Sequence, residues 1–282
     1  MLEAFEGNKA ETKTMLPVIT AFTTAHQLRD VVVVADAGMI SAANQAGIEA
    51  AGLSFILGTK IPDIPYVLSQ WRREHPDEDL LDGQVFTQPW PASTAERERG
   101  QRDKTIYYQY SADRARRTLR GINEQVTKAE NAVAGKAPVK RNRFITLTGT
   151  AKSVNRNLEA KARALAGIKG YTTNITNPSP EFVIGAYHQL WRIEKSFRMS
   201  KHDLRARPIY HYKRESIDAH LTIVFAALAV TRLIEARTGW SIKKFSQTAR
   251  RYRTIHIRAG QQLLTAEDPL PTDLRDALAQ IV

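Results

Sequence analysis

Tyr187, Glu194 and Lys201 follow one another at intervals of seven residues in the stretch YHQLWRIEKSFRMSKHDL. In a helix with 3.6 residues per turn, this spacing keeps the three side chains on one stripe, with a drift of about 20° per step. Further basic side chains flank the stripe at Arg192, Lys195 and Arg198. A carboxylate in these surroundings can bind a metal ion while its neighbours hold phosphate. The alternative is a solvated helix on which Glu194 pairs with the arginine four residues on.

Asp36 is the second candidate, because it ends the segment VVVVAD (31–36). Four consecutive valines predict a strand buried on both faces, which is typical of a central strand in a helix-covered sheet. After a turn at Ala37-Gly38, Ser41 is placed to cap a short helix that Gly52 closes, and a second strand (53–58) follows. Strand, helix and strand predict an α/β sheet, in which ligands bind at the carboxyl ends of strands. Asp36 lies at such an end.

The two carboxylates suggest a common chemistry. Asp36 and Glu194 are 158 residues apart in the sequence, and carboxylate oxygens suit Mg²⁺ or Mn²⁺. Two such ions can activate an attacking oxygen and stabilise a leaving oxygen in phosphodiester chemistry. The alternative for Asp36 is a turn residue at a helix entry.

The composition favours a nucleic-acid partner. Among the 282 residues, Lys and Arg exceed Asp and Glu by 41 − 29 = 12, and the isoelectric point is about 9.9; such an excess attracts polyanions. The absence of cysteine excludes disulfides and thiolate metal sites and fits a reducing cytoplasm. The longest nearly apolar run, 223–230, is too short to span a bilayer. We therefore expect a cytoplasmic protein with no membrane partner.

The middle of the chain differs in character from both ends. Residues 59–167 contain clustered prolines, two strand-like segments (105–111 and 143–149), a long charged helix (113–135) and the run AERERGQRDK, a solvated loop by our interpretation. We interpret this region as an insertion with a small β element and one helix. A further strand-like segment (167–175) follows it, in which Asn174 is either a turn former or a group facing the site.

The C-terminal part is mostly helical by its pattern. Pro178 and Pro180 mark the start of the helix that carries Glu194, and Pro208 lies beyond its end. A second helix (216–237), ending near Gly239, is apolar enough to be mostly buried. The tail (240–282) is basic at first, and its last helix is expected at 271–281.

Four stretches carry a resemblance to a known family: FEGNKAETKT (5–14), VVVVADAGMISAAN (31–44), GYTTNI (170–175) and YHQLWRIEKSFRMSKHDLRARPIYH (187–211). The chain resembles the DDE transposases of bacterial insertion sequences, in the branch with a tyrosine, arginine, glutamate, lysine signature. The resemblance implies an α/β fold with a ribonuclease-H-like core and an α+β insertion between the second catalytic aspartate and the catalytic glutamate. The core would occupy 1–58 and 168–239, the insertion 59–167 and a basic tail 240–282.

The resemblance also implies roles for single residues. Asp36 would be the second aspartate of the catalytic triad and Glu194 its glutamate, both as ligands of Mg²⁺ or Mn²⁺. Tyr187 and Lys201 would contact DNA phosphates near the cleaved end. The signature's arginine position holds Leu190, so either of two neighbouring arginines, Arg192 or Arg198, would take that contact.

The activity implied by the resemblance is cleavage of the ends of an insertion sequence and their transfer to target DNA. Hydroxide from water, and then a DNA 3′-hydroxyl, would attack phosphorus, and a homodimer is a family expectation. The family's first aspartate precedes a segment like FEGN, with which this chain begins. We therefore expect a truncated copy that lacks this aspartate and the first core strand. The alternatives are a non-catalytic remnant that binds DNA or dimerises with intact enzyme, and a nuclease of the same fold.

Overall fold

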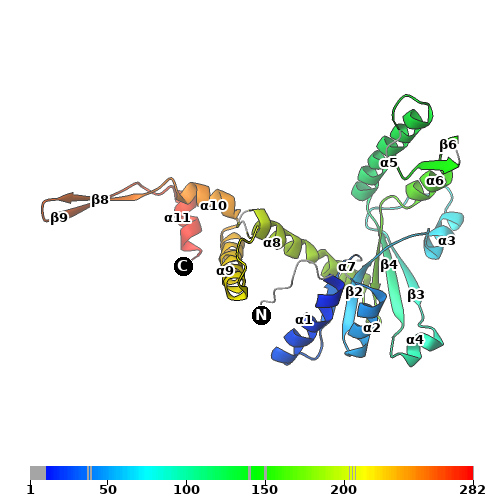
Figure 1. Cartoon of the computed structure of the whole chain (residues 1–282), viewed down its shortest axis with the longest axis horizontal. Helices are drawn as coiled ribbons and strands as arrows, with labels where there is room; N and C mark the ends of the chain where they lie inside the picture. Colours follow the sequence, from blue (N-terminus) through cyan, green and yellow to red (C-terminus); the bar gives the residue numbers. More distant parts are fainter. Residues whose placement is uncertain are drawn as a thin grey trace. The chain divides into compact units, whose positions relative to one another are not determined.

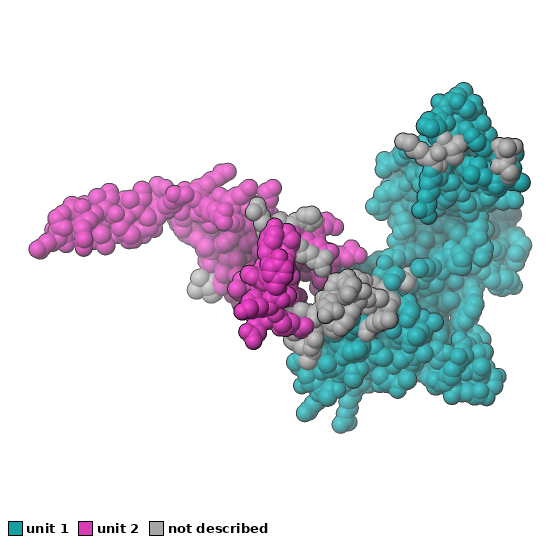
Figure 2. Space-filling view, in the orientation of Figure 1, with its two compact units in different colours: residues 1, 3–190 teal, residues 2, 191–282 magenta. Residues whose placement is uncertain are grey.

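The computed structural model describes residues 11–36, 38, 40–138, 141–148, 151–202, 204, 206 and 208–281. Of the stretches that carry the resemblance, the segment FEGNKA (5–10) and the residues Ala37, Met39, Asp203, Arg205 and Arg207 lie outside these residues. The chain divides into two compact units that meet in the sequence between Leu190 and Trp191 (Figure 2).

A five-stranded mixed sheet forms the centre of the first unit (Figure 1). Its strands, in spatial order, are β1 (Val32–Ala35), β2 (Ser54–Thr59), β7 (Ile168–Thr173), β4 (Lys104–Tyr110) and β3 (Val85–Trp90). The first pair, β1 and β2, is parallel, as the connection through a helix requires, and the other pairs are antiparallel. The mixed α/β architecture expected from the sequence is confirmed.

Helices cover the two faces of this sheet. On one face, α1 (Glu11–Ala25) and α2 (Ala42–Ala50) lie over β1 and β2, with Ile48 and Phe55 fully buried between them. On the other face, α7 (Pro180–His188) covers β2, β7 and β4, with Ile56, Tyr171 and Val183 at the centre of that cluster. Removing these apolar surfaces from water, at about 25 cal/mol per Å², is what drives the layers together.

The position of β1 corrects one prediction. The valine run is not a central strand but the edge strand among the described residues, and Val32 is 36% exposed. Alternation explains why the run is apolar nevertheless: Val33 and Ala35 face α1 and α2, while Val34 faces the α7 cluster. An unbroken apolar run indicates that both faces of a strand are covered. It does not require a neighbouring strand on both edges.

Several local signals act as the sequence predicted. The Ser41 side chain accepts from the backbone N–H of Asn44 at 3.1 Å and so caps α2. The predicted Pro180 stands at the first position of α7, and Ser179, which the sequence did not single out, caps that helix in the same way as Ser41 caps α2. The long charged helix is α5 (Ala112–Val133). Each of these signals depends only on residues a few positions away in the sequence. It can therefore be recognised without knowledge of the tertiary structure.

The middle region contributes to the main sheet, since β3 and β4 both belong to it. Its other elements are α3 (Tyr66–Glu74), α4 (Thr94–Glu98), the hairpin β5 (Ile145–Thr148) and β6 (Ala151–Val154), and α6 (Arg156–Ala164). Figure 1 shows α5, β6 and α6 grouped at one end of the sheet, where Ile122 and Phe144 are buried together. The run AERERGQRDK is not only a loop, because Ser93 and Glu96 form a capping box that starts α4 there. The expected boundaries at 58, 167 and 239 stay predictions.

The second unit consists of α8 (Leu190–His202), α9 (Arg214–Thr238), α10 (Ile242–Ala249), the hairpin β8 (Thr254–Ala259) and β9 (Gln262–Glu267), and α11 (Thr272–Ala279). As predicted, α9 ends at Gly239, which adopts φ +68°. The expectation that this helix is mostly buried is wrong, since its buried residues are Val224 and Thr231. Among the described residues, α9 is also the one helix long and apolar enough to cross a membrane.

Candidate active site

Asp36 directly follows β1, at the carboxyl edge of the parallel pair β1 and β2. The residue is exposed. Two positions earlier, Val34 faces the α7 cluster, so the alternation of the strand directs the Asp36 side chain to the same face. A carboxylate therefore stands at the edge of the sheet where α/β folds collect ligands.

Tyr187 reaches this carboxylate from α7, the helix that covers this face of the sheet. Its hydroxyl donates to Oδ1 of Asp36 at 2.6 Å, across 151 positions of sequence. The ring is 5% exposed and packs edge-on against Tyr171, with the ring centroids 5.0 Å apart. Two residues that the sequence marked for the site are thus in direct contact. The DNA contact that the resemblance implies for Tyr187 stays a prediction.

Gly58 makes the room for this contact. A Cβ atom at position 58 would stand 2.7 Å from the Tyr187 hydroxyl and 2.9 Å from Oδ1 of Asp36. Cβ atoms do not come this close to other heavy atoms. Sequence reasoning placed Gly58 only at the end of a strand. The available signal was a glycine inside an apolar strand, which often marks a close approach by another group.

Basic groups lie beside Tyr187 and its neighbour Tyr171, and the sequence did not single them out. The ammonium of Lys169, on β7, lies 4.2 Å from the centroid of the Tyr187 ring. His188, next to Tyr187 on α7, has Nε2 at 3.4 Å from the Tyr171 hydroxyl. Burial lowers the pKa of His188, and the nearby charges of Lys169 and Arg114 lower it further. The surroundings of Tyr187 are therefore electropositive.

The predicted stripe of Tyr187, Glu194 and Lys201 is interrupted. We expected one helix over 187–204, but α7 ends at His188 and α8 begins at Leu190, so Tyr187 belongs to a different helix from the other two. The N–H of Gln189 bonds to the carbonyl of Ala186, three residues back, at 3.1 Å. No glycine or proline marks this break. It falls where packing on the sheet stops, because Leu190 is the last residue that packs on the α7 cluster.

The remaining predicted residues lie on α8, in the second unit: Arg192, Glu194, Arg198 and Lys201. All four are exposed. Glu194 and Arg198 form no ion pair with each other, whereas Lys195 of the same helix pairs with Glu235 at 2.7 Å. Asp36 contacts Tyr187 within the first unit, whereas Glu194 belongs to the second unit.

The described residues hold no group of three or more His, Cys, Asp or Glu side chains that could bind a metal ion. Asp36 is one carboxylate, with one of its oxygens engaged by Tyr187. The donor set in the described part of the chain therefore does not make a metal site by itself. The expected Mg²⁺ or Mn²⁺ stays a prediction.

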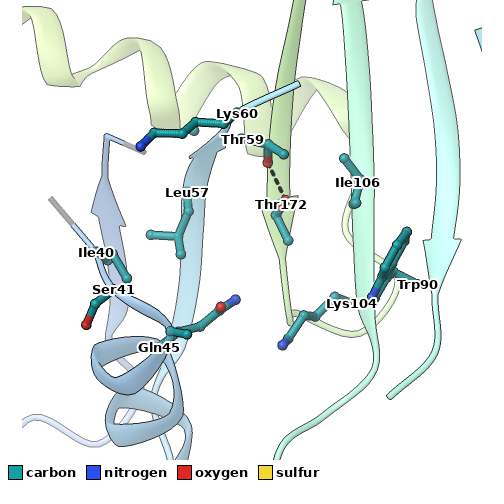
Figure 3. A pocket seen from close by; sticks show the side chains of 12 residues that line it. Ile40, Ser41, Gln45, Leu57, Thr59, Lys60, Trp90, Lys104, Ile106 and Thr172 are labelled. Carbon is teal, nitrogen blue, oxygen red and sulfur yellow. Dashed lines mark hydrogen bonds between the residues drawn. The ribbon is translucent and has the colours of Figure 1, made fainter. Parts of the chain in front are cut away.

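A separate pocket of about 400 Å³ opens on the other face of β2. Leu57, Gly58 and Thr59 of β2 line it, and the side chains of Leu57 and Thr59 alternate along the strand with that of Ile56, which faces α7. Figure 3 shows Thr59 beside Thr172, with Lys60, Lys104 and Trp90 around the opening. This pocket is not the place where Asp36 and Tyr187 meet.

Comparison with protein families identifies a family to which the chain is similar. No curated protein matches the chain. The model of the family described as the transposase DDE domain matches residues 2–230, which include Asp36, the α7–α8 region and most of α9. With most of its length matched, the chain belongs to the transposase DDE domain family.

Proposed function

We propose that this chain carries part of the catalytic centre of an insertion-sequence transposase, which cleaves DNA strands and joins them to a target by a DDE mechanism. Membership of the transposase DDE domain family supports this function. The single observation that carries the proposal is the bond from the Tyr187 hydroxyl to Oδ1 of Asp36 at 2.6 Å. The two residues to which the resemblance gives roles in the catalytic centre meet at the end of a strand, where α/β folds bind ligands.

Asp36 and Glu194 are the proposed carboxylates for divalent ions. Oxygen ligands suit Mg²⁺ or Mn²⁺, and in this chemistry such ions stabilise the attacking and leaving oxygens. Because the two residues belong to separately described units, the metal is proposed from the family and from donor chemistry alone. A ribonuclease-H-like arrangement of the core, with the expected insertion at 59–167 contributing β3 and β4 to its sheet, belongs to the same proposal.

DNA is the proposed partner, held by cations. On α8, Arg198 follows Glu194 by four residues and Lys201 follows it by seven, so all three share one face of the helix. Arg192 precedes Glu194 by two residues and projects from the opposite side. We therefore assign the arginine contact of the signature to Arg198. Lys169, beside the Tyr187 ring, is an additional candidate for a phosphate contact.

The test is DNA nicking by the purified chain. A supercoiled plasmid carrying the DNA that flanks the coding sequence is incubated with Mg²⁺ or Mn²⁺, and nicked circles are quantified on a gel. Nicking that belongs to this centre should be abolished by Asp36→Asn and by Glu194→Gln, whereas Glu124→Gln, which removes an exposed carboxylate on α5, should leave it unchanged.

The alternative, a non-catalytic remnant that binds DNA or dimerises, predicts a different result. The chain would shift the same DNA in a binding gel without nicking it, and Glu194→Gln would change nothing. That pattern would reject catalysis by this chain and retain the DNA contact.

A further inference from the structure

The pocket of about 400 Å³, which we call the sheet pocket, lies on the face of the main sheet between the areas that α2 and α3 cover. Helix α2 packs over Phe55 of β2, and α3 packs Leu68 against β3 and β4. A row of paired residues, Leu57, Thr172 and Ile106, crosses the face from one helix to the other and lines the pocket. All the lining residues belong to the first unit, so the pocket is complete within that unit.

Lys104 holds a positive charge in this pocket, largely out of water. Its side chain is 11% exposed, and Figure 3 shows it extending into the space opposite Gln45. The nearest anion is Oε2 of Glu49 at 3.9 Å, which is beyond hydrogen-bond distance. Among the described residues, that oxygen has no hydrogen-bond partner and the ammonium of Lys104 donates no hydrogen bond. A cation buried in this way costs free energy, which a bound anion would offset.

Two residues of β3 add an aromatic surface and a free acceptor. Trp90 lines the pocket, is 51% exposed and stands directly opposite Lys104 in the strand ladder. Residues paired in this way have Cβ atoms about 4.5–5.5 Å apart on one face of the sheet. Gln88 stands opposite Ile106 on the same face, and its buried Oε1 has no hydrogen-bond partner among the described residues. A flat ring that carries N–H groups would suit this side of the pocket.

The charge and size of the pocket favour a small phosphate ester. Lys60 is a second cation at the opening, and the lining residues in the described part of the chain include no Asp or Glu. Ser41 and Ala42, at the N-terminus of α2, also line it, and a helix N-terminus favours anions. Two ammonium groups match the two negative charges of a phosphate monoester. A volume of about 400 Å³ is within the range of pockets that hold one small molecule.

We propose that the sheet pocket binds a free nucleoside monophosphate, with the base against Trp90 and the phosphate held by Lys104 and Lys60. An unpaired nucleotide of a DNA strand shares this chemistry, but a pocket of this volume suits a single small molecule. The inference does not rest on the proposed function. The Asp36 carboxylate and the Tyr187 ring lie on the α7 face of β2, and the cations assigned to DNA do not line the pocket.

Calorimetric titration of the purified full chain with adenosine 5′-monophosphate tests the proposal, with adenosine and inorganic phosphate as partial ligands. We expect one saturable site that binds the nucleotide more tightly than either part. Trp90→Ala should weaken the binding of both the nucleotide and adenosine by about threefold to tenfold, because both carry the base.

Lys60→Met separates the phosphate contact from the base contact. Lys60 is exposed, so its replacement should leave the fold intact. It should weaken binding of the nucleotide about tenfold and leave adenosine unchanged. Lys104→Met should weaken nucleotide binding at least as much. Since it also removes the cation nearest to Glu49, its urea unfolding is measured alongside, and Lys60→Met decides if that variant does not fold.

Lys128→Met is the matched control, because Lys128 is an exposed lysine on α5 that does not line the pocket. It should bind the nucleotide like the original chain. Four results would each overturn the proposal: no saturable binding at millimolar nucleotide, inorganic phosphate bound as tightly as the nucleotide, equal losses in Lys128→Met and Lys60→Met, or binding of a single-stranded oligonucleotide without binding of the free nucleotide.

Discussion

Replacing Gly58 with alanine tests the contact between Tyr187 and Asp36. The new methyl carbon would lie 2.7 Å from the Tyr187 hydroxyl, 2.9 Å from Oδ1 of Asp36 and 3.1 Å from Cε2 of the tyrosine ring. The ring is 5% exposed and packed against Tyr171, so it cannot turn away. The exposed Asp36 carboxylate can turn, and its hydrogen bond would then break.

The magnitude follows from two costs. Losing a hydrogen bond to a charged group costs about 1.5–3 kcal/mol, and the exposure of Asp36 favours the low end because water replaces part of the bond. Crowding a packed region costs about 1–3 kcal/mol, again at the low end since one neighbour can move. We expect Gly58→Ala to lower the free energy of unfolding by about 2–3 kcal/mol.

The assay is urea unfolding followed by circular dichroism, in two backgrounds. In Tyr187→Phe the hydroxyl and its hydrogen bond are already absent, and the nearest remaining atoms are Oδ1 of Asp36 at 2.9 Å, which the exposed carboxylate can relieve by turning, and the ring carbon at 3.1 Å. In the Tyr187→Phe background, Gly58→Ala should therefore lower the free energy of unfolding by less than about 1 kcal/mol. The coupling free energy between the two substitutions is then at least about 1 kcal/mol.

Gly185→Ala is the control, because it lies on the same helix as Tyr187 and its Cβ would meet nothing within 4 Å. It should stabilise the protein by about 0.5–1 kcal/mol. The reasoning is refuted if Gly58→Ala stays within about 0.5 kcal/mol of the original chain, or costs the same in both backgrounds.

Three other predictions concern single side chains. Asn174→Ala removes the acceptor of the Phe55 N–H and a donor to Glu49, so urea unfolding should show a loss of about 1–3 kcal/mol; no loss would mean that water replaces the amide. Burial alone would raise the pKa of Glu235, but Lys195, the Ile242 N–H and Arg232 outweigh it and hold this pKa below its usual value. The ionised Glu235 side chain therefore contributes fully to stability above the pKa of about 4.3 that it has in the unfolded chain. This contribution is lost as the pH falls through the lower pKa of the folded state. Glu235→Gln should remove this part of the pH dependence, which denaturation curves at several pH values would measure. In binding gels with plasmid fragments, Arg198→Ala should weaken DNA binding more than Arg192→Ala, and the reverse order would reassign the arginine contact.

The sequence by itself determined the local elements and the candidate carboxylates. Ser41 caps α2 and Pro180 starts α7, because capping and proline geometry act over a few residues. The valine run before Asp36 is a strand as predicted, since an unbroken apolar run reports cover on both faces. Glu194 and its basic neighbours are indeed helical.

Only the tertiary structure decided how these parts meet. The pairing of β1 on one edge alone, and the recruitment of β3 and β4 into its sheet, depend on partners distant in sequence. No local pattern indicated the break at Gln189, because it follows from where the packing of α7 on the sheet stops.

Tertiary packing alone also decided two further features. They are the contact of Tyr187 with Asp36 over Gly58 and the exposure of one face of α9 within the second unit. A sequence pattern records which side chains are apolar or charged. Only the packing of segments far apart in the chain determines which of those side chains are covered and which are left for a partner.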